Sequence, residues 1–299
     1  MKRILLTGID GQLGQELQRI LSPIGEVIGV GRQAMDLAQP DSIRQVIGEV
    51  KPDLMVNAAA YTAVDKAQTE TELARLINAN APTIMATELE RTGGALIHVS
   101  TDYVFDGGKN TPYIESDSPN PLSVYGQSKL AGEEGIQNAS SRYIILRTAW
   151  VYGVYGKSNF VKTMLKLGAE RDEIRVVADQ VGSPTWTYDL SWAISTLGEK
   201  LTSDPTQIST LAGIYHFTNS GVASWYDFAV AIFEEAKQVG FPLKVQRVVP
   251  ITTKDYPTPA QRPAYSVLST AKISAVLGTH PPHWWRGLRQ MLMELYSNT

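Results

Sequence analysis

Arg3-Ile4-Leu5-Leu6-Thr7-Gly8-Ile9-Asp10-Gly11-Gln12-Leu13-Gly14 opens the chain with an apolar run that passes into three regularly spaced glycines. Leu13, Leu17 and Leu21 then follow at helical spacing, so the stretch predicts a strand, a tight turn and a helix. Glycines in such a turn let the backbone approach a pyrophosphate, which the free N–H groups of the new helix can bind. The spacing is Gly-x-x-Gly-x-x-Gly, a variant of the dinucleotide fingerprint, and a plain strand-to-helix turn is the alternative.

Strands and helices continue to alternate beyond this turn, which predicts an α/β fold with a Rossmann-like, doubly wound parallel sheet. We expect strands over 3–7, 27–30, 53–57, 95–100, 143–148 and 213–217. We expect helices over 12–21, 41–50, 70–92, 124–137 and 187–200, a helix capped by Ser224, and a last one from Leu288 to Tyr296.

The alternation loosens from about Trp150, where prolines become frequent. We therefore expect two interleaved domains. Residues 1–149 and about 187–218 form the Rossmann-like domain that binds the dinucleotide, and about 150–186 and 219–299 form a smaller, C-terminal substrate-binding domain.

Composition excludes several classes of protein. The 299 residues carry a net charge of −3 without a basic stripe, which argues against nucleic acid as a partner. Zero cysteines exclude disulfides, thiolate metal sites and a cysteine nucleophile, and the four histidines are scattered, with His98 expected to pack inside a strand. No apolar run approaches the roughly 18 residues that cross a membrane, so we expect a cytoplasmic enzyme.

Tyr125-Gly126-Gln127-Ser128-Lys129 places a phenol and an ammonium four residues apart, on one face of a helix. A nearby positive charge favours the phenolate, so this tyrosine is expected to have a lowered pKa and to donate a proton to a carbonyl. Thr101 follows the strand over 95–100 and offers a hydroxyl at the ligand-binding edge of the sheet. The alternatives are a packed tyrosine beside a solvated lysine, and a threonine that only ends its strand.

The end of the second strand indicates which nicotinamide cofactor is used. An NAD site places an acid there for the ribose hydroxyl, whereas this chain has Gly31-Arg32. A guanidinium suits a 2′-phosphate, so the sequence favours NADPH. Asp36-Leu37 follow in the same loop and leave use of NADH open, and a solvated loop charge is the alternative for Arg32.

Three motifs occur in this order: the glycine turn over 8–14, the strand end Ser100-Thr101-Asp102-Tyr103-Val104-Phe105, and the pair Tyr125 and Lys129. They resemble those of the extended short-chain dehydrogenase/reductases, and more narrowly those of the dTDP-4-dehydrorhamnose reductase family. The narrower resemblance rests on residues 56–67, 147–152, 159–164, 179–185 and 256–263, which are spread over most of the chain. It implies that the 4-keto group of dTDP-4-dehydro-β-L-rhamnose is reduced to give dTDP-L-rhamnose, the last step of dTDP-rhamnose synthesis.

The resemblance also implies a role for individual residues. Tyr125 would donate the proton, Lys129 would tune it and hold the nicotinamide ribose, and Thr101 would bind the same substrate oxygen. The cofactor would contact Gly8, Asp10, Gly11, Gln12, Leu13, Gly14, Arg32, Asp36, Leu37, Ala58, Ala59, Ala60, Tyr125 and Lys129. The dTDP-sugar would contact Val64, Asp65, Thr101, Tyr103, Phe105, Tyr125, Trp150, Trp225 and Arg262.

Assembly is where the chain departs from some members of the family, which pair subunits through Mg²⁺ held by carboxylates. Glu16 and Glu294 match two of the positions, but Tyr188 stands where a third glutamate would match. A hard cation needs several oxygens, so bound Mg²⁺ is not expected, and Glu16 is then a solvated helix charge. The sequence leaves a monomer and a homodimer open.

Two other functions also remain open from the sequence. One is an epimerase or dehydratase of the same superfamily, for which Asp102 would be one further acid, and the other is a non-catalytic regulatory subunit that binds a dinucleotide.

Overall fold

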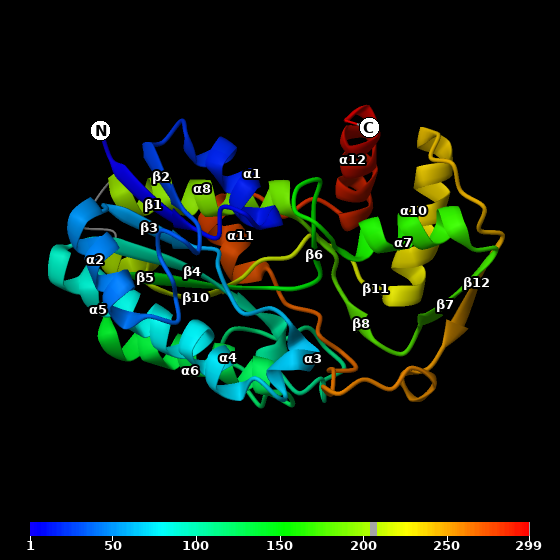
Figure 1. Cartoon of the computed structure of the whole chain (residues 1–299), viewed down its shortest axis with the longest axis horizontal. Coiled ribbons are helices and arrows are strands. Elements are labelled where there is room, and N and C mark those ends of the chain that lie inside the picture. Colours follow the sequence, from blue (N-terminus) through cyan, green and yellow to red (C-terminus); the bar gives the residue numbers. More distant parts are fainter. Residues whose placement is uncertain (204–207, 299) are drawn as a thin grey trace.

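A parallel sheet forms the centre of the larger part of the molecule (Figure 1). The computed structural model describes residues 1–203 and 208–298, and within them six strands are ordered β2-β1-β3-β4-β5-β10. Their bounds are β1 Arg3–Thr7, β2 Glu26–Val30, β3 Leu54–Asn57, β4 Ala95–Thr101, β5 Tyr143–Thr148 and β10 Gly213–His216. The chain starts inside the sheet and winds outward in both directions, so the predicted doubly wound α/β fold is confirmed, with its switch point between β1 and β3.

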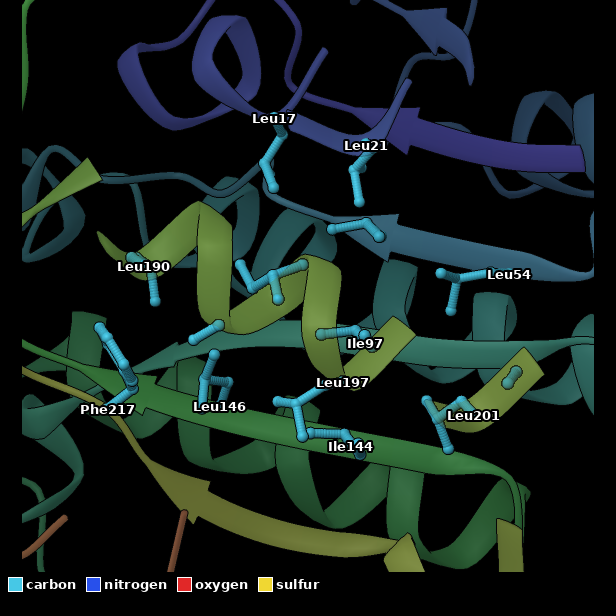
Figure 2. Packing of buried hydrophobic residues seen from close by; sticks show 14 of the residues in the cluster. Leu17, Leu21, Leu54, Ile97, Ile144, Leu146, Leu190, Leu197, Leu201 and Phe217 are labelled. Carbon is cyan, nitrogen blue, oxygen red and sulfur yellow. The ribbon is translucent and has the colours of Figure 1, made fainter. Parts of the chain in front are cut away.

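Helices cover both faces of this sheet because its strands are apolar on both sides. One face carries α1 (Gln12–Leu21), α8 (Thr187–Ser203) and α11 (Ala271–Leu277), and the other carries α2 (Pro40–Val50), α5 (Ala81–Thr92) and α6 (Val124–Ala139). Figure 2 shows the first of these cores, where Leu17 of α1 and Leu197 of α8 point toward Ile97 of β4 and its neighbours.

The predicted strands agree with the observed ones to within one residue at each end. The predicted helix over 70–92 is instead divided into α4 (Thr71–Arg75), a π-helical turn η1 (Leu76–Asn80) and α5. Pro82 lacks a backbone N–H and therefore cannot bond the carbonyl of Asn78, which accounts for the widened turn. The last helix, α12 (Trp284–Ser297), begins one turn earlier than predicted.

A separate apolar core lies beside the sheet domain and is built around α7 (Phe160–Glu170), α10 (Trp225–Val239) and α12 (Figure 1). Ser224 caps α10 in a reciprocal capping box with Asp227, which confirms the predicted start of that helix. The short strands here are β6 (Val151–Tyr152), β7 (Glu173–Val177), β8 (Val181–Gly182), β9 (Thr185–Trp186), β11 (Ala223–Ser224) and β12 (Arg247–Ile251). The remaining elements are α3 (Val64–Ala67), η2 (Asp102–Val104), α9 (Ile208–Leu211) and η4 (Thr253–Asp255).

The chain crosses between the two cores more often than the predicted boundaries allow. Ile273 of α11 belongs to the predicted range 219–299, yet it packs in the core of the large sheet. Residues 204–207 of the predicted range 187–218, and residue 299, lie outside the described residues. Within the described part of the chain, none of the helices combines the length and the apolar composition that crossing a bilayer requires.

Candidate active site

The glycine turn between β1 and α1 is shaped by close backbone contacts. Gly8 has a φ of 73°, in the left-handed region, and its carbonyl accepts a 2.9 Å hydrogen bond from the Gly11 N–H. A β-carbon at Gly14 would collide with that same carbonyl, and one at Gly8 would lie 2.9 Å from the Ala59 nitrogen. The turn therefore requires glycine at these positions and brings the start of α1 against the end of β3.

A cleft of about 630 Å³ opens beside this turn, at the carboxyl ends of the central strands. It is lined by the turn over 8–14 apart from Ile9, by Ala58, Ala59 and Ala60, and by Thr101, Tyr125 and Lys129. The cleft continues into a groove of about 340 Å³, which shares Gly8 and Asp10 with it and is also lined by Arg32, Asp36 and Leu37. The structure thus brings every predicted cofactor-binding residue to one continuous surface.

Arg32 is well placed to meet an anion in this groove. Its side chain is 77% exposed, and its Nε lies 3.9 Å from Asp36 Oδ1, a weak contact. Asp36 uses Oδ1 to accept a 3.0 Å hydrogen bond from the Ala38 N–H and so shapes its own loop. The guanidinium therefore keeps most of its donors available.

Thr101 and Tyr125 meet at one wall of the cleft because β4 ends where α6 begins to pass over it. Ser123 caps α6 by accepting a 3.2 Å hydrogen bond from the Gly126 N–H. Gly126 lets the helix lie against the Tyr103 carbonyl, which a β-carbon would not permit. The Thr101 hydroxyl donates to Asp102 Oδ1 at 3.0 Å, and burial raises the pKa of this Asp102 carboxyl to about 6.

The protonation of the tyrosine and lysine pair differs from the sequence prediction. Burial raises the pKa of Tyr125 to about 12, and a hydrogen bond with Thr101 opposes this shift without reversing it. Burial lowers the pKa of Lys129 to about 8, with Glu133 acting in the other direction. The predicted lowering of the tyrosine pKa by Lys129 is therefore wrong for this structure, in which the lysine is directed elsewhere.

Lys129 is instead engaged by β4. Its Nζ lies 3.0 Å from His98 Nε2 and donates to the Val99 carbonyl at 2.7 Å. His98 is buried inside its strand as predicted, but its contact with Lys129 was missed. Alternating positions on a strand carry His98 and Ser100 to the same face, toward α6, and this spacing is the signal that could have revealed the contact.

The indole of Trp150 closes the far side of the cleft in an unusual backbone conformation. Its φ is 48°, in a region that costs a bulky residue roughly 1–3 kcal/mol. The ring stacks on Trp225 with centroids 3.5 Å apart, and Gly182 leaves the room, since a β-carbon there would lie 2.6 Å from the indole. Val64 and Tyr103 also line the cleft.

Phe105, by contrast, is wrongly predicted as a pocket residue. It is fully buried in a small core with Tyr113, on which its ring stacks, and the Arg147 guanidinium lies 5.1 Å from the ring centroid. After Thr101 the chain turns through η2, so Tyr103 still lines the cleft whereas Val104 and Phe105 pack into the fold.

Another cavity, of about 660 Å³, lies on the other side of the aromatic stack and is lined by Trp225 and Arg262. Arg262 bridges to Asp65 at 2.9 Å, and this hydrogen-bonded ion pair lowers the pKa of the Asp65 carboxyl. The other polar residues of this cavity, which include Arg171, Arg175, Gln180 and Tyr256, were not predicted. Arg171 and Arg175 lie at strand spacing with Glu173, and this is the signal that could have revealed them, whereas Tyr256 comes from a distant segment.

Glu16 is not the solvated charge that the sequence suggested. It is fully buried, bonded to Arg19 at 2.7 Å, and burial raises its pKa while Arg19 opposes the shift. Glu294 adds a repulsive charge nearby, and Tyr188 lies at the surface above them, 38% exposed. Among the described residues, no group of three or more histidines or carboxylates gathers in a geometry that could hold a metal ion.

Comparison with known proteins places these features in context. The family described as the RmlD substrate binding domain matches residues 1–297. The dTDP-4-dehydrorhamnose reductase of Burkholderia thailandensis is 42% identical over 297 residues, which are 99% of each chain. The crystal structure of dTDP-4-dehydrorhamnose reductase from Bacillus anthracis in complex with NADP is 39% identical, has a TM-score of 0.88, and covers 98% of this chain and 99% of its own. The UDP-glucose 4-epimerase of Thermus thermophilus shares the fold at 20% identity, with a TM-score of 0.79 over 99% of this chain and 100% of its own.

Proposed function

The chain belongs to the dTDP-4-dehydrorhamnose reductase family, and from this membership we propose how its residues divide the work of the reaction. The enzyme reduces the 4-keto group of dTDP-4-dehydro-β-L-rhamnose to give dTDP-L-rhamnose, the last step of dTDP-rhamnose synthesis. NADPH is its reductant. The observation that carries the proposal is the single cleft in which the glycine turn faces Thr101, Tyr125 and Lys129.

The cleft fits a reduced dinucleotide, which supplies the hydride when it is bound. The glycine turn would receive the pyrophosphate, since its residues line the cleft and no side chain caps the first-turn N–H groups of α1. Arg32 would bind the 2′-phosphate, and NADH, which lacks that phosphate, would bind less well. Lys129 would hold the nicotinamide ribose hydroxyls at the inner end of the cleft.

Proton donation is assigned to Tyr125. Its phenol shares the cleft wall with the Thr101 hydroxyl, so both groups can bond one carbonyl oxygen of the sugar. The high pKa of the tyrosine keeps the phenol protonated in the free enzyme. The phenol can then donate its proton as negative charge develops on the sugar oxygen. A charged Lys129 would then stabilise the phenolate.

The two ends of the substrate would occupy the cavities on either side of the tryptophan stack. Val64, Tyr103 and Trp150 would surround the sugar, and the cavity beyond Trp225 would take the nucleotide end. Arg171, Arg175 and Arg262 line that second cavity together with the acidic Glu173 and Asp255, and the guanidinium groups offer donors that suit a diphosphate. Asp65 would act through its ion pair by fixing Arg262.

Stoichiometric oxidation of NADPH by the 4-keto sugar nucleotide, followed by absorbance, tests the proposal. An epimerase or dehydratase retains its cofactor, and a regulatory subunit consumes none, so neither would oxidise the added NADPH in proportion to the sugar. Tyr125→Phe should slow this oxidation by roughly 10²–10⁴-fold. Tyr143→Phe is a matched control that should preserve the rate, because Tyr143 begins β5, at the end of the strand away from the cleft.

Location and assembly are further parts of the proposal. We place the enzyme in the cytoplasm, because a chain without cysteine gains nothing from an oxidising compartment. A monomer or a homodimer without bridging Mg²⁺ agrees with Tyr188 in place of a carboxylate above Glu16. The molar mass in solution, measured with and without a chelator, tests both statements about assembly.

A further inference from the structure

A buried chain of polar side chains connects the cleft to the centre of the sheet. Lys129 Nζ lies 3.0 Å from His98 Nε2, and His98 Nδ1 lies 2.9 Å from Asn57 Nδ2. Asn57 Oδ1 accepts a 2.7 Å hydrogen bond from the Thr7 hydroxyl. Lys129, His98 and Asn57 are each 1% exposed, so their hydrogen bonds must be satisfied within the protein.

The orientation of the Asn57 amide is fixed by the backbone. The Ala59 N–H lies 3.3 Å from both Asn57 Oδ1 and the Thr7 hydroxyl oxygen. A rotated amide would set its NH₂ group against this N–H, placing two donors face to face. Oδ1 therefore faces Thr7 and Ala59, and the NH₂ group donates to His98.

This orientation determines the tautomer of the histidine. His98 Nδ1 accepts the proton of Asn57, so a neutral imidazole carries its own proton on Nε2. Burial lowers the pKa of His98 well below its usual value, so the ring is neutral. Nε2–H then points at Lys129 Nζ, which can accept it only through the lone pair of an uncharged amine.

We propose that His98 is a positioning residue that favours the neutral amine of Lys129 in the free enzyme at mildly alkaline pH, and that the lysine becomes charged when the cofactor ribose hydroxyls replace His98. The idea rests on the proposed role of Lys129 toward the ribose. Above about pH 8 most Lys129 is uncharged while the site is open, and it becomes an ammonium beside Tyr125 once the cofactor is bound.

The groups that face Lys129 leave its amine little electrostatic reason to be charged in the free enzyme. Glu133, on the same helix, favours the ammonium, but Arg147 on β5 holds that carboxylate in a buried ion pair of 2.6 Å. Tyr125 is protonated and uncharged near neutral pH. On β3 the facing group is the uncharged Asn57 amide, and the burial that lowers the pKa of Lys129 to about 8 is opposed by little.

The consequence is that cofactor binding takes up protons. If the ammonium is stabilised in the complex to at least its usual pKa near ~10.4, uptake per cofactor should rise from about 0.1 at pH 7 to about 0.5 at pH 8 and about 0.9 at pH 9. Cofactor binding raises the pKa of Lys129, so the complex binds more protons than the free enzyme and becomes weaker as pH increases. Affinity should therefore fall by up to about tenfold per pH unit above 8.

Calorimetry in buffers of different ionisation enthalpy measures this uptake without requiring turnover. NADH is titrated alongside NADPH, so that protons on the 2′-phosphate are excluded from the result. Lys129→Met should remove the uptake. His98→Gln places an amide oxygen toward the lysine, should favour a charged Lys129 in the free protein, and should reduce uptake at pH 8 below the wild-type value of about 0.5.

His216→Gln is the matched control, because His216 is also buried and bonded through Nδ1, to the Tyr113 carbonyl at 3.2 Å, away from Lys129. It should keep the wild-type uptake. Absence of uptake in the wild type at pH 8 and 9, or unchanged uptake in His98→Gln, would overturn the proposal. Uptake without 4-keto sugar reduction would leave it standing while refuting the proposed function.

Nitrogen NMR of the wild-type protein provides a measurement that needs no folded His98 variant. The histidine signals are assigned by elimination, using glutamine variants at 216, 280 and 283. A His98 ring with a bare Nδ1 and a protonated Nε2 in the free enzyme supports the proposal. The opposite tautomer would mean that Lys129 donates as an ammonium, and the inference would be wrong.

Discussion

Replacing Arg32 with alanine tests the cofactor preference at its predicted source. A charge-assisted hydrogen bond is worth roughly 1.5–3 kcal/mol, and the 77% exposure of this side chain places its contribution at the lower end because solvent screens it. At ~1.4 kcal/mol per tenfold, about 1–1.5 kcal/mol corresponds to a loss of roughly 5- to 12-fold in affinity for NADPH. NADH should be nearly unaffected, since it has no phosphate to lose.

The assay is kcat/KM for each cofactor at saturating sugar nucleotide, measured at low and high salt. The NADPH advantage of the wild type should shrink as salt screens an exposed contact. Arg44→Ala is a suitable control, because Arg44 is another exposed arginine, on α2, paired with Asp41 at 2.9 Å. An unchanged NADPH/NADH ratio in Arg32→Ala would show that the guanidinium is merely solvated and that selection lies elsewhere in the loop.

Three other substitutions address catalysis, the turn and the fold. Tyr125→Phe should lower kcat by roughly 10²–10⁴-fold with little change in cofactor affinity, and retention of a tenth of the wild-type rate would refute its role as the acid. Gly14→Ala should abolish cofactor binding in equilibrium titrations or unfold the N-terminal turn, because its β-carbon meets the Gly8 carbonyl; normal binding would contradict the turn geometry. Arg147→Met leaves the Glu133 carboxylate buried without its partner and should lower the free energy of unfolding by about 3–5 kcal/mol in denaturant titrations, whereas a loss below about 1 kcal/mol would show that Glu133 is not stranded.

Local patterns predicted well those features that depend on local geometry. The glycine turn, the strands and the cap at Ser224 follow from neighbouring residues whose backbone preferences and spacing act within a few positions. The helix over 70–92 was predicted as one element because its apolar spacing is continuous, and the π turn follows from a single proline whose missing N–H that spacing does not register.

The residues of the candidate site also divide into those that local motifs reveal and those that only tertiary packing places. Thr101, Tyr125 and Lys129 were found through short motifs, and the doubly wound sheet then brings strand ends and helix starts to one edge. Phe105 was misplaced because the direction of its side chain is set by the turn at η2 and by packing on Tyr113. In the second cavity, Arg171 and Arg175 lie at strand spacing with Glu173, whereas Arg262 comes from a distant segment that no local spacing connects to them.

The sequence by itself determined the fold class, the kind of cofactor and the identity of the reacting side chains, because each depends on residue types at short, regular spacing. Tertiary structure alone decided the protonation of those side chains. Burial raises the pKa of Tyr125 to about 12 and lowers that of Lys129 to about 8, and the shift of the tyrosine is opposite to the one that the helical spacing of the pair implied. Electrostatic free energies depend on which groups surround a charge and how much water reaches it, and only the folded chain defines both.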